Sequence, residues 1–253
     1  MPSVINRALF VSLVLSSGLT TSAMAQKLEF NSSGTQTQLI ELYTSQGCSS
    51  CPPAENLLSK QLGNKKLWEE IIPIAFHVDY WDYLGWKDIY SKASFSERQR
   101  RHYQLRNVSS VYTPGFVVDG KEWRGFFRGL DFPDTQAAGG SLTLNWDSDT
   151  QHAKASYQSK AKQAKYCYFA VLGFDQSVAI QGGENRGLKL AQNFVALQVQ
   201  KKSIKTEAGN GQCQTTLEIA AQSAVAAPPH SRAIVSWVTD GAERPLQATG
   251  GWL

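Results

Sequence analysis

The sequence is poor in cysteine, in net charge and in long hydrophobic runs. Four cysteines in 253 residues are too few for a small chain held together by disulfides, so the core has to come from apolar packing. The formal charge of +4 becomes +3 without the first 25 residues, where Arg7 is the only charged side chain, and so small an excess does not indicate nucleic-acid binding. No segment reaches the length of a transmembrane helix.

The N-terminal segment has the pattern of a secretory signal. Arg7 precedes a short apolar run, residues 8–15, and Ala23-Met24-Ala25 provides small residues for cleavage. We expect residues 1–25 to be a signal peptide and the mature chain to begin at Gln26. The expected location is outside the cytoplasm: the periplasm in a Gram-negative bacterium and secretion otherwise. After cleavage, no contact with a membrane is expected.

Cys48-Ser49-Ser50-Cys51 is the most informative motif. It follows an apolar, strand-like run (39–43) and precedes a helix-like stretch. The free amide groups and the dipole at a helix N-terminus lower the pKa of a nearby thiol and favour a nucleophilic thiolate. The motif therefore indicates a thiol/disulfide redox centre. Half of a zinc site is the alternative, but such sites use two spaced pairs of ligands and the chain has no second close pair.

The mature chain has two parts with different sequence patterns. Residues 36–132 mix strand and helix patterns, residues 133–140 resemble a linker, and residues 141–253 have a β pattern. We predict an α/β domain in the first part and a smaller antiparallel β-sandwich-like domain in the second. The strands expected in the second part are residues 141–146, 152–158, 165–174, 194–200, 212–220 and 232–239.

The first part contains a strand–helix–strand unit. Residues 38–44 and 71–78 are strand-like, and residues 54–62 between them have helical spacing. A parallel crossover brings the ends of both strands to one edge of the sheet, where the Cys48 loop would meet the segment after His77. Ser94 and Glu97 form a capping-box pattern that predicts a helix through about residue 107.

A Thr-Pro pair precedes the next strand. Thr113-Pro114 is followed by an apolar run and by an Asp119-Gly120 turn, which predicts a hairpin with residues 121–126. The order of these elements resembles the thioredoxin fold, in which this proline is cis and lies against the reactive disulfide. The resemblance implies that Pro114 is part of the catalytic site and that the Thr113 backbone binds an extended substrate. An ordinary trans proline at a strand start is the alternative.

Three motifs resemble a particular family. These motifs are Glu41-Leu42-Tyr43-Thr44-Ser45-Gln46-Gly47-Cys48-Ser49-Ser50-Cys51-Pro52-Pro53-Ala54-Glu55, Phe76-His77-Val78-Asp79-Tyr80-Trp81-Asp82-Tyr83-Leu84-Gly85-Trp86 and Gly183-Glu184-Asn185-Arg186-Gly187. Together they resemble the exported, thioredoxin-like domain of unknown function 1223 family, over nearly the whole mature chain. The resemblance implies a thioredoxin-like part followed by a β-rich part, but the family has no assigned activity.

The predicted chemistry is thiol–disulfide exchange. Cys48 would attack a partner and Cys51 would resolve the mixed disulfide. The resemblance to thioredoxins implies a buried acid beneath the pair, and Glu41 is the candidate to accept the Cys51 proton. Glu41 lies seven residues before Cys48, one more than in typical thioredoxins, so a surface or salt-bridged Glu41 is the alternative.

Polar and aromatic residues follow the second strand of the crossover. We predict that Trp81 and Trp86 help to form a groove for a substrate polypeptide and that His77 and Asp79, on one face of an extended strand, move a proton. The alternative is that the aromatic rings pack against helices and that His77 is a satisfied core residue.

Cys167 and Cys213 each lie in a predicted strand of the β-rich part. We expect a structural disulfide between them, because distant cysteines in strands of exported domains usually have that role. The alternative is a second redox pair that passes electrons to Cys48 and Cys51. The turn at residues 182–187 could contact the first part of the chain or could be a plain loop.

The sequence thus predicts an exported thiol:disulfide oxidoreductase that acts on protein thiols or disulfides. Its partner would be a substrate polypeptide or a redox protein, and no cofactor or metal is expected. An alternative is a soft-metal module that holds copper(I) with Cys48, Cys51 and His77. A third is a β-sandwich interaction protein whose redox part has lost its activity.

Overall fold

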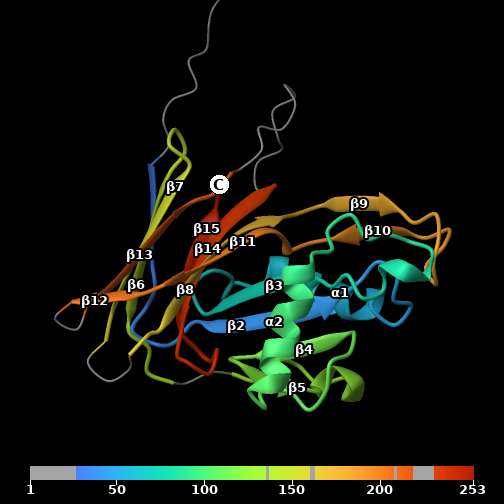
Figure 1. Ribbon diagram of the computed structural model, residues 1–253, viewed down its shortest axis with the longest axis horizontal. Helices are drawn as coiled ribbons and strands as arrows, with labels where there is room; N and C mark the ends of the chain where they lie inside the picture. Colours follow the sequence, from blue (N-terminus) through green and yellow to red (C-terminus); the bar gives the residue numbers. More distant parts are fainter. Residues whose placement is uncertain (1–26, 135–136, 160–162, 208–209, 219–230) are drawn as a thin grey trace, which may run out of the picture.

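The computed structural model describes residues 27–134, 137–159, 163–207, 210–218 and 231–253 (Figure 1). The expected signal peptide and the end of the strand expected at 212–220 lie outside these residues. The largest element is an eight-stranded sheet with the order β15-β14-β8-β11-β3-β2-β4-β5. In chain order, its strands are β2 (Gln38–Thr44), β3 (Ile71–His77), β4 (Gly115–Val118), β5 (Lys121–Trp123), β8 (Tyr166–Gly173), β11 (Val195–Ser203), β14 (Arg232–Thr239) and β15 (Pro245–Trp252).

The predicted parallel crossover forms the centre of this sheet. β2 and β3 are parallel, with Thr44 opposite His77, and every residue of both strands is buried. The connection runs through α1 (Pro52–Ser59) and the 3₁₀ helix η1 (Lys60–Gly63). Two prolines open α1, where the backbone N–H groups that proline lacks would have no partner within the helix. Both strands therefore end at the same edge of the sheet, beside the start of α1.

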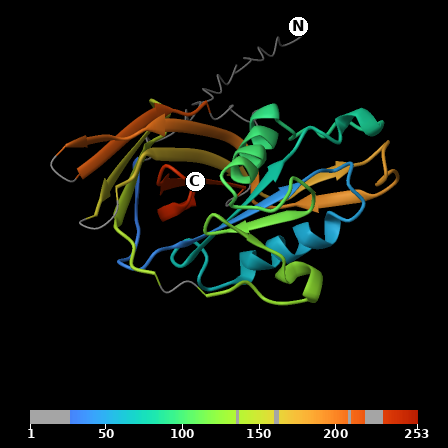
Figure 2. The ribbon, with the colours of Figure 1, turned by 60° about the horizontal axis from the view of Figure 1, so that its bottom comes forward.

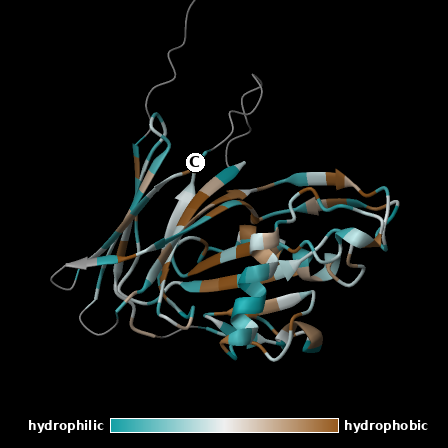
Figure 3. Ribbon diagram, in the orientation of Figure 1, coloured by the Kyte–Doolittle hydropathy of each residue, from teal (hydrophilic) through white to brown (hydrophobic). Residues whose placement is uncertain are grey.

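The two α-helices cover opposite faces of the sheet (Figure 2). α1 buries Ala54 and Leu58 on one face, whereas α2 (Ala93–Gln104) buries Phe95 on the other. The Phe95 ring lies edge-on to Phe76 of β3, with 5.3 Å between ring centroids. Most of α2 is hydrophilic (Figure 3), so few apolar contacts hold it in place. Two short 3₁₀ helices, η2 (Asp82–Leu84) and η3 (Gly125–Arg128), lie before α2 and after β5.

A five-stranded sheet packs against the large sheet. Its strands alternate between exposed and buried residues, and the buried face contacts residues of β8 and β14. The Cys167–Cys213 disulfide joins β8 in the large sheet to β13 in this one, and such a bond contributes about 2–4 kcal/mol to stability. The order of the sheet is β1 (Lys27–Asn31), β6 (Ser141–Asp147), β7 (His152–Gln158), β13 (Asn210–Thr216) and β12 (Lys205–Glu207).

The remaining strands form a two-stranded hairpin, β9 (Gln176–Ala179) and β10 (Lys189–Gln192). Within the described residues, these strands pair only with each other. The hairpin extends β8 and β11 beyond the edge of the large sheet, toward α1 and the loop that follows β2 (Figure 1). We call residues 180–188, which connect the two strands, the cover loop.

The predicted α/β thioredoxin-like domain followed by a smaller β-sandwich-like domain is wrong. The described residues contain fifteen strands and two α-helices, and most strands belong to the two larger sheets. The large sheet contains strands from both sides of residues 133–140, because Val195 of β11 pairs in parallel with Ala75 of β3. The crossover unit leaves the outer edge of β3 free, and a late strand fills it. Local patterns do not reveal such a long-range pairing.

Candidate functional site

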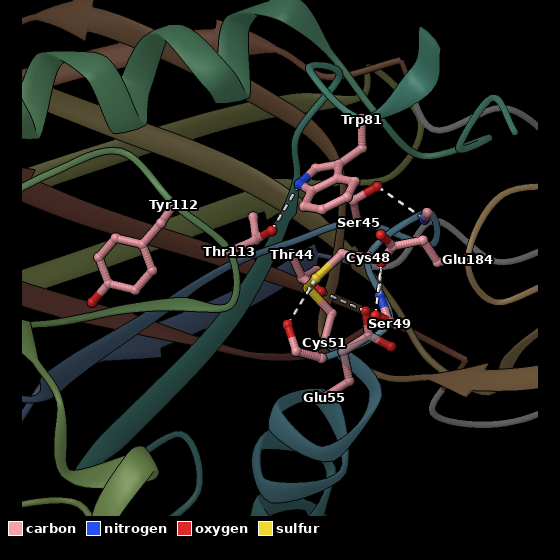
Figure 4. The surroundings of a disulfide bond; sticks show 12 residues. Thr44, Ser45, Cys48, Ser49, Cys51, Glu55, Trp81, Tyr112, Thr113 and Glu184 are labelled. Carbon is pink, nitrogen blue, oxygen red and sulfur yellow. Dashed lines mark hydrogen bonds between the residues drawn. A yellow bond between two sulfur atoms is a disulfide. The ribbon is translucent and has the colours of Figure 1, made fainter. Parts of the chain in front are cut away.

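Cys48 and Cys51 form a disulfide between the end of β2 and the start of α1 (Figure 4). Cys51 is the N-cap residue of α1, and its carbonyl accepts the backbone N–H of Glu55 at 3.0 Å. The Ser50 hydroxyl lies 3.4 Å from the Cys48 sulfur. Cys48 is 1% exposed and Cys51 is fully buried. The disulfide thus lies at the positive end of a helix dipole but below the molecular surface.

Thr113 and Trp81 lie on one side of this disulfide. The Thr113–Pro114 peptide bond is cis, as the resemblance to thioredoxins implies. The Trp81 indole N–H donates a hydrogen bond of 2.8 Å to the Thr113 hydroxyl (Figure 4). The predicted residues Trp81, Thr113 and Pro114 are therefore brought together beside the cysteine pair.

A buried carboxylate that the sequence analysis missed lies on the other side, on α1. Glu55 follows Cys51 by one helical turn, and Figure 4 shows it next to Thr44 and the disulfide. Its carboxylate accepts hydrogen bonds from the Thr44 hydroxyl at 2.6 Å and from the Gln192 side-chain amide at 3.0 Å. The spacing Cys51 to Glu55 is the sequence signal that could have revealed this residue, since residues four apart share one helix face.

His77 forms a buried pair with Asp88 next to the Cys48 loop. Its Nδ1 atom lies 2.6 Å from an Asp88 carboxylate oxygen, which also accepts the backbone N–H of Gln46 at 2.8 Å. His77 Nε2 has no hydrogen-bond partner among the described residues. Burial disfavours the imidazolium, but the Asp88 carboxylate outweighs burial and raises the pKa of His77. Burial likewise acts against ionisation of Asp88, yet His77 and the backbone N–H donors lower the pKa of Asp88.

The other two residues of that predicted cluster have different surroundings. The Trp86 indole N–H donates to the Gln46 side-chain carbonyl at 3.0 Å, which places Trp86 at the Cys48 loop. Asp79 instead bonds to the Ser96 hydroxyl on α2. His77 and Asp79 thus have separate partners, and no proton path joins them directly.

The His77–Asp88 pair predicts a pH-dependent stability. A raised His77 pKa stabilises the folded chain fully below the ordinary imidazole pKa of about 6.5, and this contribution is lost as the pH rises through the raised value. The lowered Asp88 pKa stabilises the folded chain above the ordinary carboxyl pKa of about 4, and this stabilisation is lost on acidification. Asp88→Asn should therefore lower the free energy of unfolding most between pH about 4 and about 6.5. In alkali, the loss should be smaller by about 1 kcal/mol.

Urea unfolding of both proteins across this pH range measures the difference. Glu55 and Tyr90 also face His77, so both are kept in every variant. Exposed Asp131 provides the control, since Asp131→Asn should cost the same small amount at every pH. A pH-independent cost of Asp88→Asn would show that His77 stays neutral.

Glu41 lies in a separate ionic cluster on the opposite face of the sheet from Glu55. Arg98 of α2 donates two hydrogen bonds to the Glu41 carboxylate, at 2.8 and 2.9 Å, and the Tyr43 hydroxyl donates a third at 2.8 Å. Burial raises the pKa of the Glu41 carboxyl, but Arg98 outweighs it and holds that pKa far below its usual range. Thr44, three residues on, points to the other face and meets Glu55. The structure thus brings Glu55, not Glu41, to the disulfide.

The cover loop lies over the Cys48 loop, so the turn at residues 182–187 does contact the first part of the chain. Asn185 is buried, and its side-chain amide donates to the backbone carbonyls of Gln46 and Cys48, both at 2.9 Å. The Glu184 carboxylate accepts the Ser49 backbone N–H at 3.0 Å and the Ser49 hydroxyl at 2.7 Å (Figure 4). These hydrogen bonds lower the pKa of Glu184.

The described residues contain neither a cluster of metal ligands nor a membrane-spanning helix. No group of three or more His, Cys, Asp or Glu side chains in this part of the chain is placed to hold a metal ion. Cys48, Cys51 and His77 therefore do not form a ready copper site there. None of the described helices is both long and apolar enough to cross a bilayer.

The fold and the site define a class of protein with two large sheets and a two-stranded hairpin, in which a Cys-x-x-Cys disulfide lies at the start of a helix that follows a central parallel strand. The chain belongs to the family described as protein of unknown function DUF1223, whose sequence profile matches residues 39–238. No curated protein matches the chain.

Two solved structures are similar in fold. Protein AGR_C_4864 from Agrobacterium tumefaciens is 20% identical, with a TM-score of 0.56 over 87% of this chain and 94% of that one. HBP35 of Porphyromonas gingivalis is 14% identical, with a TM-score of 0.56 over 88% of this chain and 76% of that one. At these identities, the likeness concerns the fold alone.

Proposed function

We propose that this protein is a thiol:disulfide oxidoreductase that acts on polypeptide thiols or disulfides through Cys48 and Cys51. The observation that carries the proposal is the Cys48–Cys51 disulfide at the N-terminus of α1, with the Glu55 carboxylate on the same helix. The helix dipole favours a thiolate, and a dithiol that closes a disulfide can exchange two electrons with a partner.

The exchange proceeds in two steps. In the reductive direction, the Cys48 thiolate attacks one sulfur of a partner disulfide, which forms a mixed disulfide and releases one partner thiolate. The Cys51 thiolate then attacks the Cys48 sulfur, re-forms the Cys48–Cys51 bond and releases the second partner thiolate. Two electrons and two protons pass from the dithiol to the partner, and the oxidative direction is the reverse.

We assign the proton acceptor for Cys51 to Glu55 rather than to Glu41. Glu41 is held by the cation Arg98 on the α2 face. Glu55 lies one helical turn from Cys51, and two neutral donors, Thr44 and Gln192, hold its carboxylate. Its place on the Cys51 helix, beside the disulfide, therefore fits a proton acceptor for Cys51 better than that of Glu41.

The expected partner is an extended polypeptide beside Thr113 and Trp81, which lie on one side of the disulfide. We propose that the exchange takes place outside the cytoplasm, where disulfides persist. The Cys167–Cys213 bond joins two sheets, which supports a structural role for that pair.

A glutathione redox series tests the proposal. The fraction of the Cys48–Cys51 pair that is oxidised is read by thiol trapping and mass spectrometry, with Cys167 and Cys213 followed separately. We expect a reversible two-electron equilibrium. A potential near about −270 mV would indicate a reductant and one near about −120 mV an oxidant. A pair that never equilibrates at any ratio would refute the proposed function.

A further inference from the structure

Burial of the disulfide poses a problem of access. Thiol–disulfide exchange requires an attacking sulfur to reach one sulfur of the pair, yet Cys48 is 1% exposed and Cys51 is fully buried. The two residues between them, Ser49 and Ser50, are exposed. The cover is therefore provided by other parts of the chain.

The cover loop is held in place at its tip by polar contacts. Asn185 binds the carbonyls of Gln46 and Cys48, and Glu184 binds both donors of Ser49. These four hydrogen bonds all reach the short segment from Gln46 to Ser49. None of them involves the cysteine sulfurs, so they position the backbone that carries Cys48.

The cover loop also fits tightly against the segment that carries Trp86. A Cβ atom on Gly182 would lie 2.1 Å from the Gly85 carbonyl oxygen, and one on Gly183 would lie 3.2 Å from the Trp86 Cβ. Gly183 also has a positive φ of 68°. Only glycine permits this close approach. The two glycines therefore let the cover loop pack directly against the segment of Gly85 and Trp86.

The base of the hairpin is attached differently from its tip. Gln192 at the end of β10 binds Glu55 and the Gln46 side chain, at 3.0 and 2.9 Å. The strands themselves join no other sheet in the described part of the chain. Loss of the contacts at the tip would free Ser49 and the Cys48 carbonyl and would leave the hydrogen bonds of Gln192 at the base in place.

We propose that Asn185 and Glu184 are the specificity-determining residues of the site, because a polypeptide reaches Cys48 only by displacing their hydrogen bonds. The inference rests on the proposed function and adds to it. The displaced contacts leave two carbonyls that need a donor and one amide that needs an acceptor. An extended polypeptide backbone supplies both kinds of group at regular spacing, whereas dithiothreitol supplies only two hydroxyl groups on a short flexible chain.

The experiment measures how fast the Cys48–Cys51 disulfide is reduced by two reagents, dithiothreitol and reduced, unfolded ribonuclease A. Asn185→Ala and Glu184→Ala are compared with Arg186→Ala, an exposed position in the same loop. With Asn185→Ala, we expect the ratio of the dithiothreitol rate to the ribonuclease rate to rise by about tenfold. The reason is that the hydrogen bonds to the Gln46 and Cys48 carbonyls, which dithiothreitol replaces less well than a polypeptide does, are lost. Arg186→Ala should match the wild type for both reagents.

Several outcomes separate this inference from the proposed function. If the wild-type pair equilibrates with glutathione but Asn185→Ala and Glu184→Ala react like Arg186→Ala with both reagents, the role of the cover loop is refuted and the proposed function stands. If no variant is reduced by either reagent, both are refuted. Glu184 is exposed, so Glu184→Ala keeps the test decisive should Asn185→Ala fail to fold.

Discussion

A Cys48→Ser variant is expected to reduce polypeptide disulfides at least about a thousandfold more slowly than the wild type. The serine hydroxyl cannot form a disulfide with the partner, so the first bond of the exchange is never made. The rate of insulin reduction with dithiothreitol as the electron donor measures the loss. Ser141→Ala, at an exposed position in β6 of the five-stranded sheet, is the control and should match the wild type.

Two variants should impair the second step, the attack of Cys51, in distinguishable ways. Cys51→Ser is expected to accumulate a mixed disulfide at Cys48, visible by mass spectrometry, because nothing resolves it. Glu55→Gln should slow that resolution without blocking it. The amide has the size and shape of the carboxylate but does not act as a base. Full activity in Cys48→Ser would refute Cys48 as the attacking residue.

Arg98→Met is expected to lower the free energy of unfolding by about 3–5 kcal/mol, because it leaves the buried Glu41 carboxylate without its cation. Arg98 also lies over the rings of Tyr168 and Trp237, at 4.7 and 5.4 Å from their centroids. Urea unfolding at neutral pH, followed by circular dichroism, measures the change.

Two further variants show whether the buried, unpaired Glu41 carboxylate causes this loss of stability. Removing both partners in a Glu41→Leu, Arg98→Met double variant should cost less than Arg98→Met alone, because no uncompensated charge remains buried. Arg100→Met, on the exposed side of the same helix, should change stability by no more than about 0.5 kcal/mol. Equal costs for Arg98→Met and Arg100→Met would show that the ionic cluster adds nothing to stability.

Local sequence patterns were sufficient for the elements around the cysteine pair. The apolar run of β2 matches the predicted range of residues 38–44, and β3 matches within one residue. The turn at Asp119-Gly120 was also predictable, because both residues adopt positive φ, which Asp and Gly tolerate. Each of these signals acts over a few neighbouring residues.

The capping box shows the limit of a local signal. Ser94 and Glu97 fit the pattern, but α2 begins at Ala93, with Lys92 as its N-cap residue and no side-chain cap. The helix instead starts where the chain returns to the end of β3, because the Lys92 N–H donates a hydrogen bond to the His77 carbonyl. Tertiary contacts set the helix boundary here.

The acid of the site was only partly open to sequence reasoning. The alternation along β2 predicts that Glu41 and Thr44 face opposite sides, but it does not say which helix covers which side. The spacing from Cys51 pointed to Glu55, whereas Asp88 and Asn185 become neighbours of the Cys48 loop only through contacts between distant segments. The same limitation hid the β3–β11 pairing and led to the wrong fold class.

The hairpin that precedes β11 has a consequence for synthesis of the chain. Cys48 and Cys51 leave the ribosome about 140 residues before Asn185 and Gln192 do, and domains begin to fold from the N-terminal end during synthesis. Until that later segment emerges, the Cys48 loop lacks the amide of Asn185 and Glu55 lacks the amide of Gln192. The surroundings of the two thiols in the nascent chain therefore differ from those in the finished protein until the hairpin has been made.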